Sequence, residues 1–437
     1  MSVIKQSDSK LYVIQKNNGS LRDILKDMYV HVRAFSEKIA EPLEPEDFVV
    51  QSMPDVSPAK WHLAHTSWFF ETFILAENDK NYKPFDEKFS FLFNSYYVQV
   101  GDRWFRPNRG LLSRPTVKEV FEYRRFVDEQ MANFFEIAND ETIEKFRVPL
   151  EIGFNHEQQH QELMITDIKH VFSINPLYPV YKSFEDDISR DLPKQNWVPL
   201  DEGVYEFGQR GDSFFYDNEK PVHKQFIHGF AVSSLPVTNG EYLAFMNDDG
   251  YTRTELWLSN GIAAVEENGW NAPLYWHKID GEWYSYTLGG LKKINPNEPV
   301  THISYYEADA YARWADARLL SEFEWELVSK NFEIEGNFVD NERFHVLPLT
   351  KDENKSVSRL FGDTWEWTKS DYAAYPGYRI PPGAIGEYNG KFMSGQYVLR
   401  GGSCATSADH IRRTYRNFFA PASRWQFSGI RLAKDLR

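Results

Sequence analysis

Apolar residues recur with the period of a helix through the first 175 residues of the chain. One such stretch follows Ser20, a residue type that favours the position before a helix. Its apolar face holds Leu21, Ile24, Leu25, Met28, Val32 and Phe35. A second stretch begins at Ser57 and Pro58, because proline fits the first helical position, and continues to Leu75.

Two further amphipathic stretches follow in the same part of the chain. Thr116 and Glu119 have the spacing of a capping box, which predicts a helix over residues 117–138. Pro149 is expected to open a fourth helix that runs to residue 172. Four long helices predict a four-helix bundle, a fold in which metal ligands project inward from facing helices.

The pattern changes after residue 175. Residues 176–195 are rich in proline and charge, as is typical of a linker. The elements predicted beyond it are strands over 197–208 and 224–234, helices over 239–248 and 304–315, and a helix that Ser321 and Glu324 open as a capping box. Short elements and long loops predict a second domain of α+β type over residues 196–437, after a helical domain over residues 1–175.

Two histidines at helical spacing are the first candidate metal ligands. His156 and His160 lie on one face of the fourth predicted helix, and with Glu157 they fit the H-E-x-x-H pattern of zinc peptidases. A third ligand can come from His62 or His65 on the second helix, and periodicity does not choose between them. His170 lies too far along the helix axis, about 15 Å from His160. Three neutral histidines suit iron(II), copper or zinc alike.

A long connection between the second and third predicted helices holds several arginines. Residues 91–116 contain Tyr96 and Tyr97, followed by Arg103, Arg106, Arg109 and Arg114. Connections of this length in a bundle are often functional. Arginine binds carboxylates with two parallel hydrogen bonds, so the loop is a candidate site for an acidic substrate. The simpler interpretation is that these arginines pair with carboxylates of the chain itself.

Charge and cysteine content exclude several classes of protein. The 437 residues carry a net charge of −15, which argues against nucleic acid as a partner. Cys404 is the only cysteine, so neither an internal disulfide nor a cysteine-based zinc site can form. No apolar stretch reaches the roughly 20 residues of a membrane span, and no signal peptide is recognisable. We therefore expect a cytoplasmic protein without a membrane partner.

Five segments together resemble the ergothioneine-biosynthesis sulfoxide synthases, and the resemblance extends over nearly the whole chain. The segments are SPAKWHLAHTSWFFE, NSYYVQVGDRWFRPNRGLLSRP, NHEQQHQELM, GDTWEWTKSDYAAYPGY and LRGGSCATSADHIRRTYRNFFAPASRWQFSGIRLA. The resemblance implies a DinB-like four-helix bundle at the N-terminus. It also implies a C-terminal domain like the formylglycine-generating enzymes, with a C-type-lectin-like fold.

The resemblance also implies a metal and a reaction. The metal is non-haem iron(II), held by His65, His156 and His160, and Glu157 is then not a peptidase base. The family uses O2 to join a cysteine-type sulfur to C2 of the imidazole of hercynine, which is Nα-trimethylhistidine, and oxidises the sulfur to a sulfoxide. A phenol near the metal, Tyr97 or its neighbour Tyr96, supplies a proton or an electron.

Substrate contacts follow from the same resemblance. Gln159 and Asn417 match positions that hold the hercynine carboxylate. Aromatic faces such as Phe418 and Trp425 suit the trimethylammonium group, although core packing explains each of them as well.

The donor assignment rests on one departure from the family pattern. Arg103 and Arg106 match the pair that binds the carboxylate of the sulfur donor. Relatives that use γ-glutamylcysteine carry Asp where this chain has Phe419, so we expect free cysteine as the donor.

Other functions stay open at the level of sequence. A relative that forms a carbon–selenium bond from a selenosugar, the reaction of a selenoneine synthase, would have a similar sequence, and so would a γ-glutamylcysteine-dependent synthase. A zinc hydrolase is supported by H-E-x-x-H alone. A non-catalytic metal-binding protein is a further alternative, but it would not explain the arginines of residues 91–116 or the pair Tyr96 and Tyr97. The cysteine oxidation of formylglycine-generating enzymes needs two cysteines, whereas Cys404 is alone and is expected in the core. The oligomeric state is not readable.

Overall fold

The computed structural model describes residues 3–16, 19–184, 195–211, 213–354, 356–383, 386 and 388–436. The chain divides into two units. A helical unit comprises Gln6–Tyr181 and Pro381–Tyr388, and a mixed unit comprises Met1–Lys5, Lys182–Ile380 and Asn389–Arg437. Residues 185–194, which belong to the predicted linker 176–195, lie outside the described residues.

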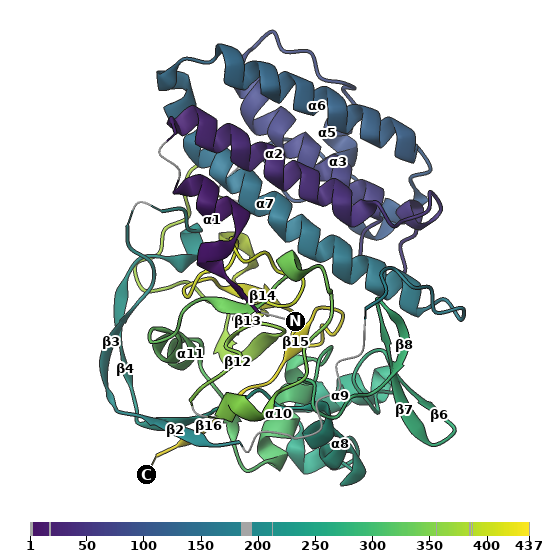
Figure 1. Cartoon of the computed structure of the whole chain (residues 1–437), viewed down its shortest axis with the longest axis vertical. Helices are drawn as coiled ribbons and strands as arrows, with labels where there is room; N and C mark the ends of the chain where they lie inside the picture. The colour runs from purple at the N-terminus through teal and green to yellow at the C-terminus, as the bar shows by residue number, and fades with distance from the viewer. Residues whose placement is uncertain are drawn as a thin grey trace. The chain divides into compact units, whose positions relative to one another are not determined.

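Four long helices form the framework of the helical unit within its described residues (Figure 1). They are α2 (Leu21–Ala40), α3 (Ala59–Phe70), α6 (Val117–Ile137) and α7 (Asp140–Ser173). The shorter elements are η1 (Gln6–Asp8), α1 (Lys10–Gln15), η2 (Asp47–Val49), η3 (Glu71–Leu75), α4 (Ala76–Asn78), α5 (Phe89–Phe93) and η4 (Arg106–Leu111). Every residue of α3 is buried, so this helix lies at the centre of the unit.

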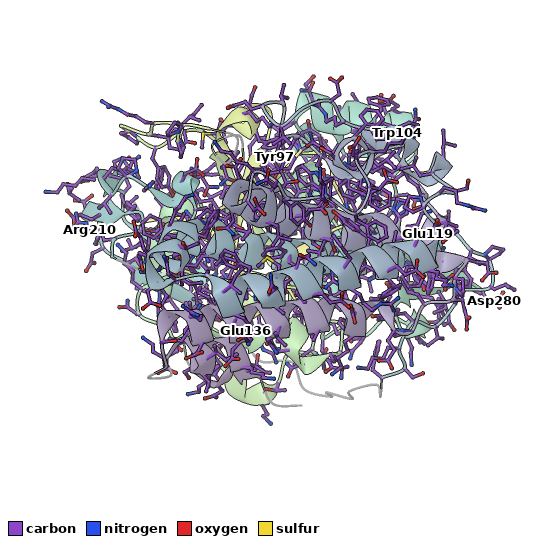
Figure 2. All side chains as sticks on the ribbon, turned by 90° about the horizontal axis from the view of Figure 1, so that it is seen from above. Tyr97, Trp104, Glu119, Glu136, Arg210 and Asp280 are labelled. Atoms are coloured by element: carbon purple, nitrogen blue, oxygen red, sulfur yellow. The ribbon has the colours of Figure 1, made fainter. Side chains whose placement is uncertain are left out.

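The predicted caps explain where the helices begin. Ser20 accepts a hydrogen bond from the backbone N–H of Asp23, and Thr116 forms the predicted capping box with Glu119. Figure 2 shows Glu119 and Glu136 toward opposite ends of α6.

The predicted start of the fourth helix at Pro149 is wrong. The helix α7 begins at Asp140, nine residues before Pro149, and Asn139 caps it. Pro149 therefore lies inside the helix. Proline lacks the N–H that would bond to the preceding turn. The burial of Phe146 and Leu150 on either side of it offsets that loss. A cap with Asp140 and Glu141 in the first turn is a stronger start signal than the proline.

The mixed unit contains five small sheets among its described residues. Their strand orders are β14-β13-β12-β15, β2-β5-β16-β9, β6-β7-β8, β1-β10-β11 and β3-β4. The strands are β1 (Ile4–Lys5), β2 (Trp197–Leu200), β3 (Gly203–Phe207), β4 (His223–Ile227), β5 (Phe230–Ser233), β6 (Trp276–Ile279), β7 (Glu282–Thr287), β8 (Gly290–Lys293), β9 (Arg318–Leu319), β10 (Glu335–Asn337), β11 (Phe361–Gly362), β12 (Trp365–Asp371), β13 (Tyr397–Arg400), β14 (Asn417–Phe419), β15 (Ser428–Gly429) and β16 (Leu432–Asp435).

Three helices of the mixed unit match the predicted ones, and α9 (Ser259–Asn268) was not predicted. The matching helices are α8 (Asn239–Asn247), α10 (Tyr305–Trp314) and α11 (Glu322–Ser329), and the short turns are η5 (Asp217–Glu219), η6 (Thr254–Leu256), η7 (Val339–Asn341), η8 (Lys351–Asn354) and η10 (Gly390–Phe392). Ser321 and Glu324 form the predicted capping box of α11. In the part of the chain that the structure describes, none of the helices has the length and apolar character that crossing a membrane requires.

Each of the two predicted strands in this unit is divided in two. β2 and β3 replace the strand predicted over 197–208, and β4 and β5 replace the one over 224–234. β3 pairs with β4 as a hairpin, whereas β2 pairs with β5 in a different sheet. The chain therefore changes sheets between the paired segments. The alternation of burial is also interrupted there, because the less exposed positions are Val198 and Leu200 in β2 but Gly203, Tyr205 and Phe207 in β3.

A buried ion cluster fixes β14 and its neighbours in the mixed unit. Glu322 of α11 accepts hydrogen bonds from Arg400 of β13, at 2.8 Å, and from Arg416 next to β14, at 2.8 and 3.0 Å. All three side chains are buried. Buried charges need such partners, because an unpaired one would remain desolvated without compensation.

Candidate metal centre

Three histidines from two facing helices converge in the helical unit. His65 lies on α3, while His156 and His160 lie one turn apart on α7. One nitrogen from each ring can be chosen so that the three atoms lie within 4.8 Å of one another. The structure thus brings together the three histidines that the resemblance implies as ligands.

Aromatic rings hold His65 in one orientation. Its imidazole stacks between Trp61 and Trp68, with ring centroids 4.6 and 5.4 Å away and interplanar angles of 16° and 13°. Its Nδ1 lies 2.5 Å from the carbonyl oxygen of Phe93, which accepts the Nδ1 proton. That bond leaves the lone pair on Nε2, which faces α7.

Burial keeps the three imidazoles neutral. Desolvation lowers the pKa of His65 and of His160 well below the ordinary range, with the neighbouring histidines adding to the effect. Desolvation also lowers the pKa of His156 to about 3. Metal ions bind neutral imidazole, so near neutral pH the site already has the protonation state that a metal requires.

The nitrogens of His65 and His156 have the spacing of two ligands of one ion. His65 Nε2 lies 3.1 Å from His156 Nε2. Two nitrogens bound at about 2.1 Å and at right angles to each other would lie about 3.0 Å apart. Nδ1 of His156 is buried and has no hydrogen-bond partner among the described residues. Because no acceptor faces that atom, a proton on it would be unsatisfied unless a water joins it.

Glu157 points into a different part of the bundle from the histidines. Its carboxylate is fully buried and accepts hydrogen bonds from Arg124 at 2.7 Å, Ser36 at 2.6 Å and Arg33 at 3.2 Å. Burial alone would raise the pKa of Glu157, but Arg124 and Arg33 overcome it and hold the pKa at about 2. A carboxylate that is paired with two guanidinium groups cannot serve as a general base. The zinc peptidase interpretation of H-E-x-x-H therefore lacks the base that it requires.

Tyr96 and Tyr97 lie in the loop that follows α5, close to the histidines. An Asn94 side chain shapes this turn by accepting the Tyr97 N–H and donating to the Tyr97 carbonyl. The Tyr97 ring is buried and packs on Trp68, with centroids 5.6 Å apart, so it lies one ring away from His65. Tyr96 stacks on Tyr97 at 4.6 Å. Burial raises the pKa of Tyr96, so its phenol keeps its proton.

Tyr388 is a site residue that sequence reasoning missed. It belongs to the segment Pro381–Tyr388. This segment is part of the helical unit, although it follows the rest of that unit, which ends at Tyr181, by about 200 residues in the chain. Its ring packs edge-on against His156, with centroids 5.8 Å apart, and lies 6.0 Å from Tyr96. Its hydroxyl donates to the side-chain oxygen of Gln159. No pattern around Tyr388 indicates this placement, because nothing local distinguishes it from the chain's other tyrosines.

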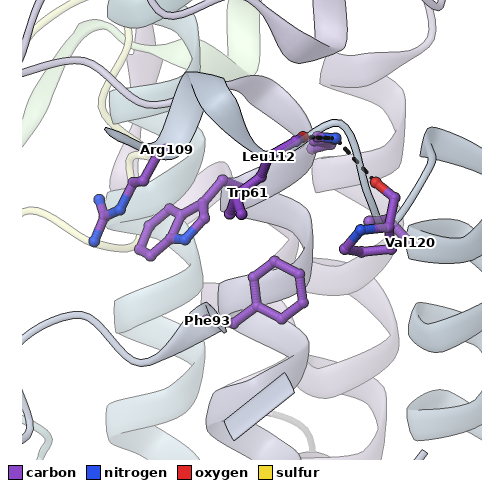
Figure 3. Close-up of a pocket in the computed structure, with 7 residues that line it drawn as sticks. Trp61, Phe93, Arg109, Leu112 and Val120 are labelled. Carbon is purple, nitrogen blue, oxygen red and sulfur yellow. Dashed lines mark hydrogen bonds between the residues drawn. The ribbon is translucent and has the colours of Figure 1, made fainter. Parts of the chain in front are cut away.

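The arginines of the loop divide into a buried one and exposed ones. Arg109 is buried and lies over the Trp61 indole at 3.3 Å (Figure 3). It donates to the hydroxyls of Ser57 and Ser95. Among the described residues Arg109 has no carboxylate within ion-pair distance, contrary to the simpler interpretation, and it packs against Trp61 instead. Arg103 and Arg106 are exposed, and within the described residues neither forms an ion pair. Arg103 borders a surface hollow of about 560 Å³.

Three further predicted site residues lie in the mixed unit. Asn417 and Phe418 are on β14, and the Asn417 side chain accepts the N–H of Phe418. Phe418 stacks on Tyr372 with centroids 4.0 Å apart, and Trp425 packs edge-on against Phe419. The indole N–H of Trp425 is buried without a partner among the described residues. Their proposed substrate roles stay predictions.

Comparison with known proteins identifies both units. The family described as sulfatase-modifying factor enzyme 1-like domain matches residues 184–346 and 340–436, and the DinB superfamily matches residues 28–164. Hercynine oxygenase of Mycolicibacterium thermoresistibile is 29% identical over 413 residues, which cover 88% of this chain and 88% of that protein. The chain belongs to the ergothioneine-biosynthesis sulfoxide synthase family.

Other relatives match a smaller part of the chain. Hercynine oxygenase of Mycobacterium tuberculosis is 33% identical over 241 residues, or 50% of this chain and 56% of that protein. Ergothioneine biosynthesis protein 1 of Schizosaccharomyces pombe is 29% identical over 235 residues, or 51% of this chain and 28% of that protein. As in the predicted fold of the family, a DinB-like helical domain precedes a domain of sulfatase-modifying-factor type, so the fold class is confirmed.

Proposed function

We propose that this chain is a non-haem iron(II)-dependent sulfoxide synthase that joins the sulfur of cysteine to C2 of the hercynine imidazole. The observation that carries the proposal is the cluster of three neutral histidines on α3 and α7, with His65 and His156 buried and His160 half-buried. The relatives named hercynine oxygenase support an oxygenase that acts on hercynine, and the formation of the carbon–sulfur bond is what the family resemblance implies. In this reaction hercynine loses its C2–H, cysteine loses its S–H, and O2 provides the sulfoxide oxygen and one molecule of water.

His65, His156 and His160 would hold the iron through Nε2. Three protein ligands would leave other coordination positions of the metal open to substrates and O2. When bound, iron(II) supplies the one-electron chemistry that lets O2 react with a thiol and an imidazole. The stacking of His65 between two indoles and the hydrogen bond to Phe93 keep that ligand in place before any metal arrives.

The phenols beside the histidines hold a proton in a site with little water. Tyr97 is fully buried, and burial keeps Tyr96 protonated. Either hydroxyl can deliver a proton or a hydrogen atom during O2 reduction, and we assign this role to Tyr97 as the resemblance implies. Tyr388 contacts both His156 and Gln159, so it orients the groups on the α7 side of the site.

Substrate recognition is assigned to polar and aromatic groups. Arg103 and Arg106 would bind the carboxylate of cysteine, because both guanidinium groups are exposed and lack ion-pair partners among the described residues. Gln159 and Asn417 would bind the carboxylate of hercynine, and Phe418 or Trp425 its trimethylammonium group. Phe419 lacks the carboxylate that a γ-glutamyl amine would need, which supports free cysteine as the donor.

A product assay tests the proposal. The protein is reconstituted with iron(II) without oxygen and then exposed to air with hercynine, cysteine, γ-glutamylcysteine and a selenosugar in competition. We expect the cysteine–hercynine sulfoxide as the main product by mass spectrometry, and none with His156→Ala. A seleno-product or γ-glutamyl product formed faster than the cysteine product would reassign the donor. If no donor is joined to hercynine, the proposed reaction is wrong.

A further inference from the structure

His62, a histidine outside the proposed set of metal ligands, contacts the proposed ligand His160. Nδ1 of His62 lies 2.8 Å from Nδ1 of His160. Nε2 of His62 lies 3.0 Å from Oδ2 of Asp167. His62 and Asp167 are 3% and 4% exposed, so water does not compete for these contacts. The three side chains form a continuous chain of hydrogen bonds that ends on a proposed metal ligand.

The proton positions in this chain follow from the atoms present. Oδ2 of Asp167 also accepts the backbone N–H of Ser57 at 2.8 Å, so it acts as an acceptor toward both neighbours. His62 must then carry a proton on Nε2 to donate to it. If His62 is neutral, its Nδ1 has a lone pair, and the proton in the 2.8 Å contact belongs to Nδ1 of His160.

This arrangement determines which nitrogen of His160 is available. A neutral imidazole with its proton on Nδ1 has its lone pair on Nε2, on the opposite side of the ring. The opposite tautomer would place a proton on Nε2, where the metal binds. With a neutral His62, the contacts with His62 and Asp167 therefore select the tautomer of His160 whose Nε2 can act as a ligand.

We propose that His62, oriented by Asp167, is a positioning residue that holds His160 in its metal-binding tautomer and is not itself a ligand. The two other proposed ligands differ from His160 in what contacts their Nδ1 atoms. A backbone carbonyl fixes Nδ1 of His65, whereas Nδ1 of His156 has no partner among the described residues. His160 alone is connected through a second histidine to a carboxylate, an arrangement that also makes its Nε2 a stronger donor to a metal.

The inference rests on the proposed metal site and not on the proposed reaction, so its test uses metal binding without substrates. Cobalt(II), which oxygen affects less than iron(II), is titrated into the metal-free protein while its visible absorption is recorded. His62→Leu removes both hydrogen bonds and keeps a similar volume. His62→Gln keeps an acceptor for His160 and a donor for Asp167. Far-ultraviolet circular dichroism checks that both variants are folded.

We expect His62→Leu to raise the dissociation constant for cobalt(II) by about 10–100-fold, a common effect of losing the group that orients a ligand. His62→Gln should restore most of the affinity. Equal affinity in His62→Leu and the unmutated protein would overturn the inference and leave the metal site standing. If the unmutated protein binds no cobalt(II), the metal site and the inference both fall.

A measurement on the unmutated protein does not depend on how the variants fold. In metal-free protein labelled with 15N-histidine, nuclear magnetic resonance distinguishes a protonated ring nitrogen from a bare one. We expect His160 to carry its proton on Nδ1 and to have a bare Nε2. The opposite assignment would overturn the inference.

Discussion

Arg124 and Glu157 form an ion pair that is shielded from solvent, with 2.7 Å between Nη2 and Oε1 and both side chains fully buried. The pair connects α6 to α7, and Arg33 of α2 adds a second guanidinium to the same carboxylate. Glu157 directly follows His156 in the chain, so its anchoring fixes the rotation of α7 about its axis. That rotation is what directs His156 and His160 toward α3.

Removing the charge of Glu157 should destabilise the helical unit strongly. Glu157→Gln removes the anion that Arg124 and Arg33 share, while Arg33 keeps Asp128 and Arg124 keeps Glu37 as partners. Breaking a buried pair typically costs about 3–5 kcal/mol, so we expect a loss toward the lower end of that range. The measurement is the unfolding free energy in urea, followed by far-ultraviolet circular dichroism. The exposed Glu144→Gln serves as the control and should change that free energy by less than about 0.5 kcal/mol. A loss for Glu157→Gln as small as that of the control would mean that the buried pair does not support the bundle.

The metal-free protein should lose stability as the pH falls below neutral. The folded-state pKa of His65 lies well below 6.5, and that of His156 lies at about 3. Between those values and 6.5 the unfolded chain binds protons that the folded chain does not, so acid favours unfolding. Each histidine contributes about 1.4 kcal/mol per pH unit in that window. The measurement is the unfolding free energy of chelator-treated protein between pH 7.5 and pH 5 in unmutated protein and in His156→Gln. If the unfolding free energy of His156→Gln changed with pH as steeply as that of the unmutated protein, a neutral, buried His156 would be contradicted.

Loss of the Tyr97 hydroxyl should change the product but not the fold. Tyr97→Phe keeps the ring that packs on Trp68 and Phe73, so iron content and thermal stability should survive. If the phenol serves O2 reduction, sulfoxide formation falls and oxidation of cysteine to a sulfinate increases. The assay compares product ratios for Tyr97→Phe, Tyr96→Phe and Tyr388→Phe. An unchanged ratio in Tyr97→Phe alone would assign the role to one of the other two phenols.

Arg103 should contribute to binding of the cysteine carboxylate. Losing one charge-assisted hydrogen bond from a desolvated carboxylate costs roughly 1.5–3 kcal/mol, so Arg103→Leu should raise KM for cysteine at least about ten-fold. KM for hercynine should barely change. Arg114→Leu, in the same loop, is the control, since its side chain donates to the carbonyl of Ser113. Arg106 is a less clean test because its guanidinium also donates to the carbonyl of Asp55. Equal effects of Arg103→Leu on both substrates would contradict the assignment.

Local patterns predicted the long helices of the bundle, for physical reasons. Capping residues and apolar periodicity act over one or two turns, so Ser20, Thr116 and Ser321 could be recognised without any tertiary information. His156 and His160 face the same way because of helical geometry alone. The choice between His62 and His65 could not be made from spacing, since only tertiary contacts distinguish them. His65 faces His156, whereas His62 bridges His160 and Asp167.

Long-range packing accounts for what the sequence could not show. Tyr388 reaches the histidines from a segment far along the chain, and Arg109 stacks on an indole instead of pairing with a carboxylate. The helix that continues through Pro149 depends on burial on both sides of the proline. In each case a tertiary contact outweighs the local preference that the sequence displays.

Metal analysis of single variants tests the central claim of a three-histidine iron centre most directly. The protein and its variants are reconstituted with iron(II) without oxygen, and bound iron is counted after gel filtration. The account predicts about one iron per chain in the unmutated protein and in His170→Ala, whose ring instead contacts the Ser52 hydroxyl. It predicts a loss of most bound iron in His65→Ala, His156→Ala and His160→Ala. Full iron content in any one of these three variants, with folding intact, would contradict the account.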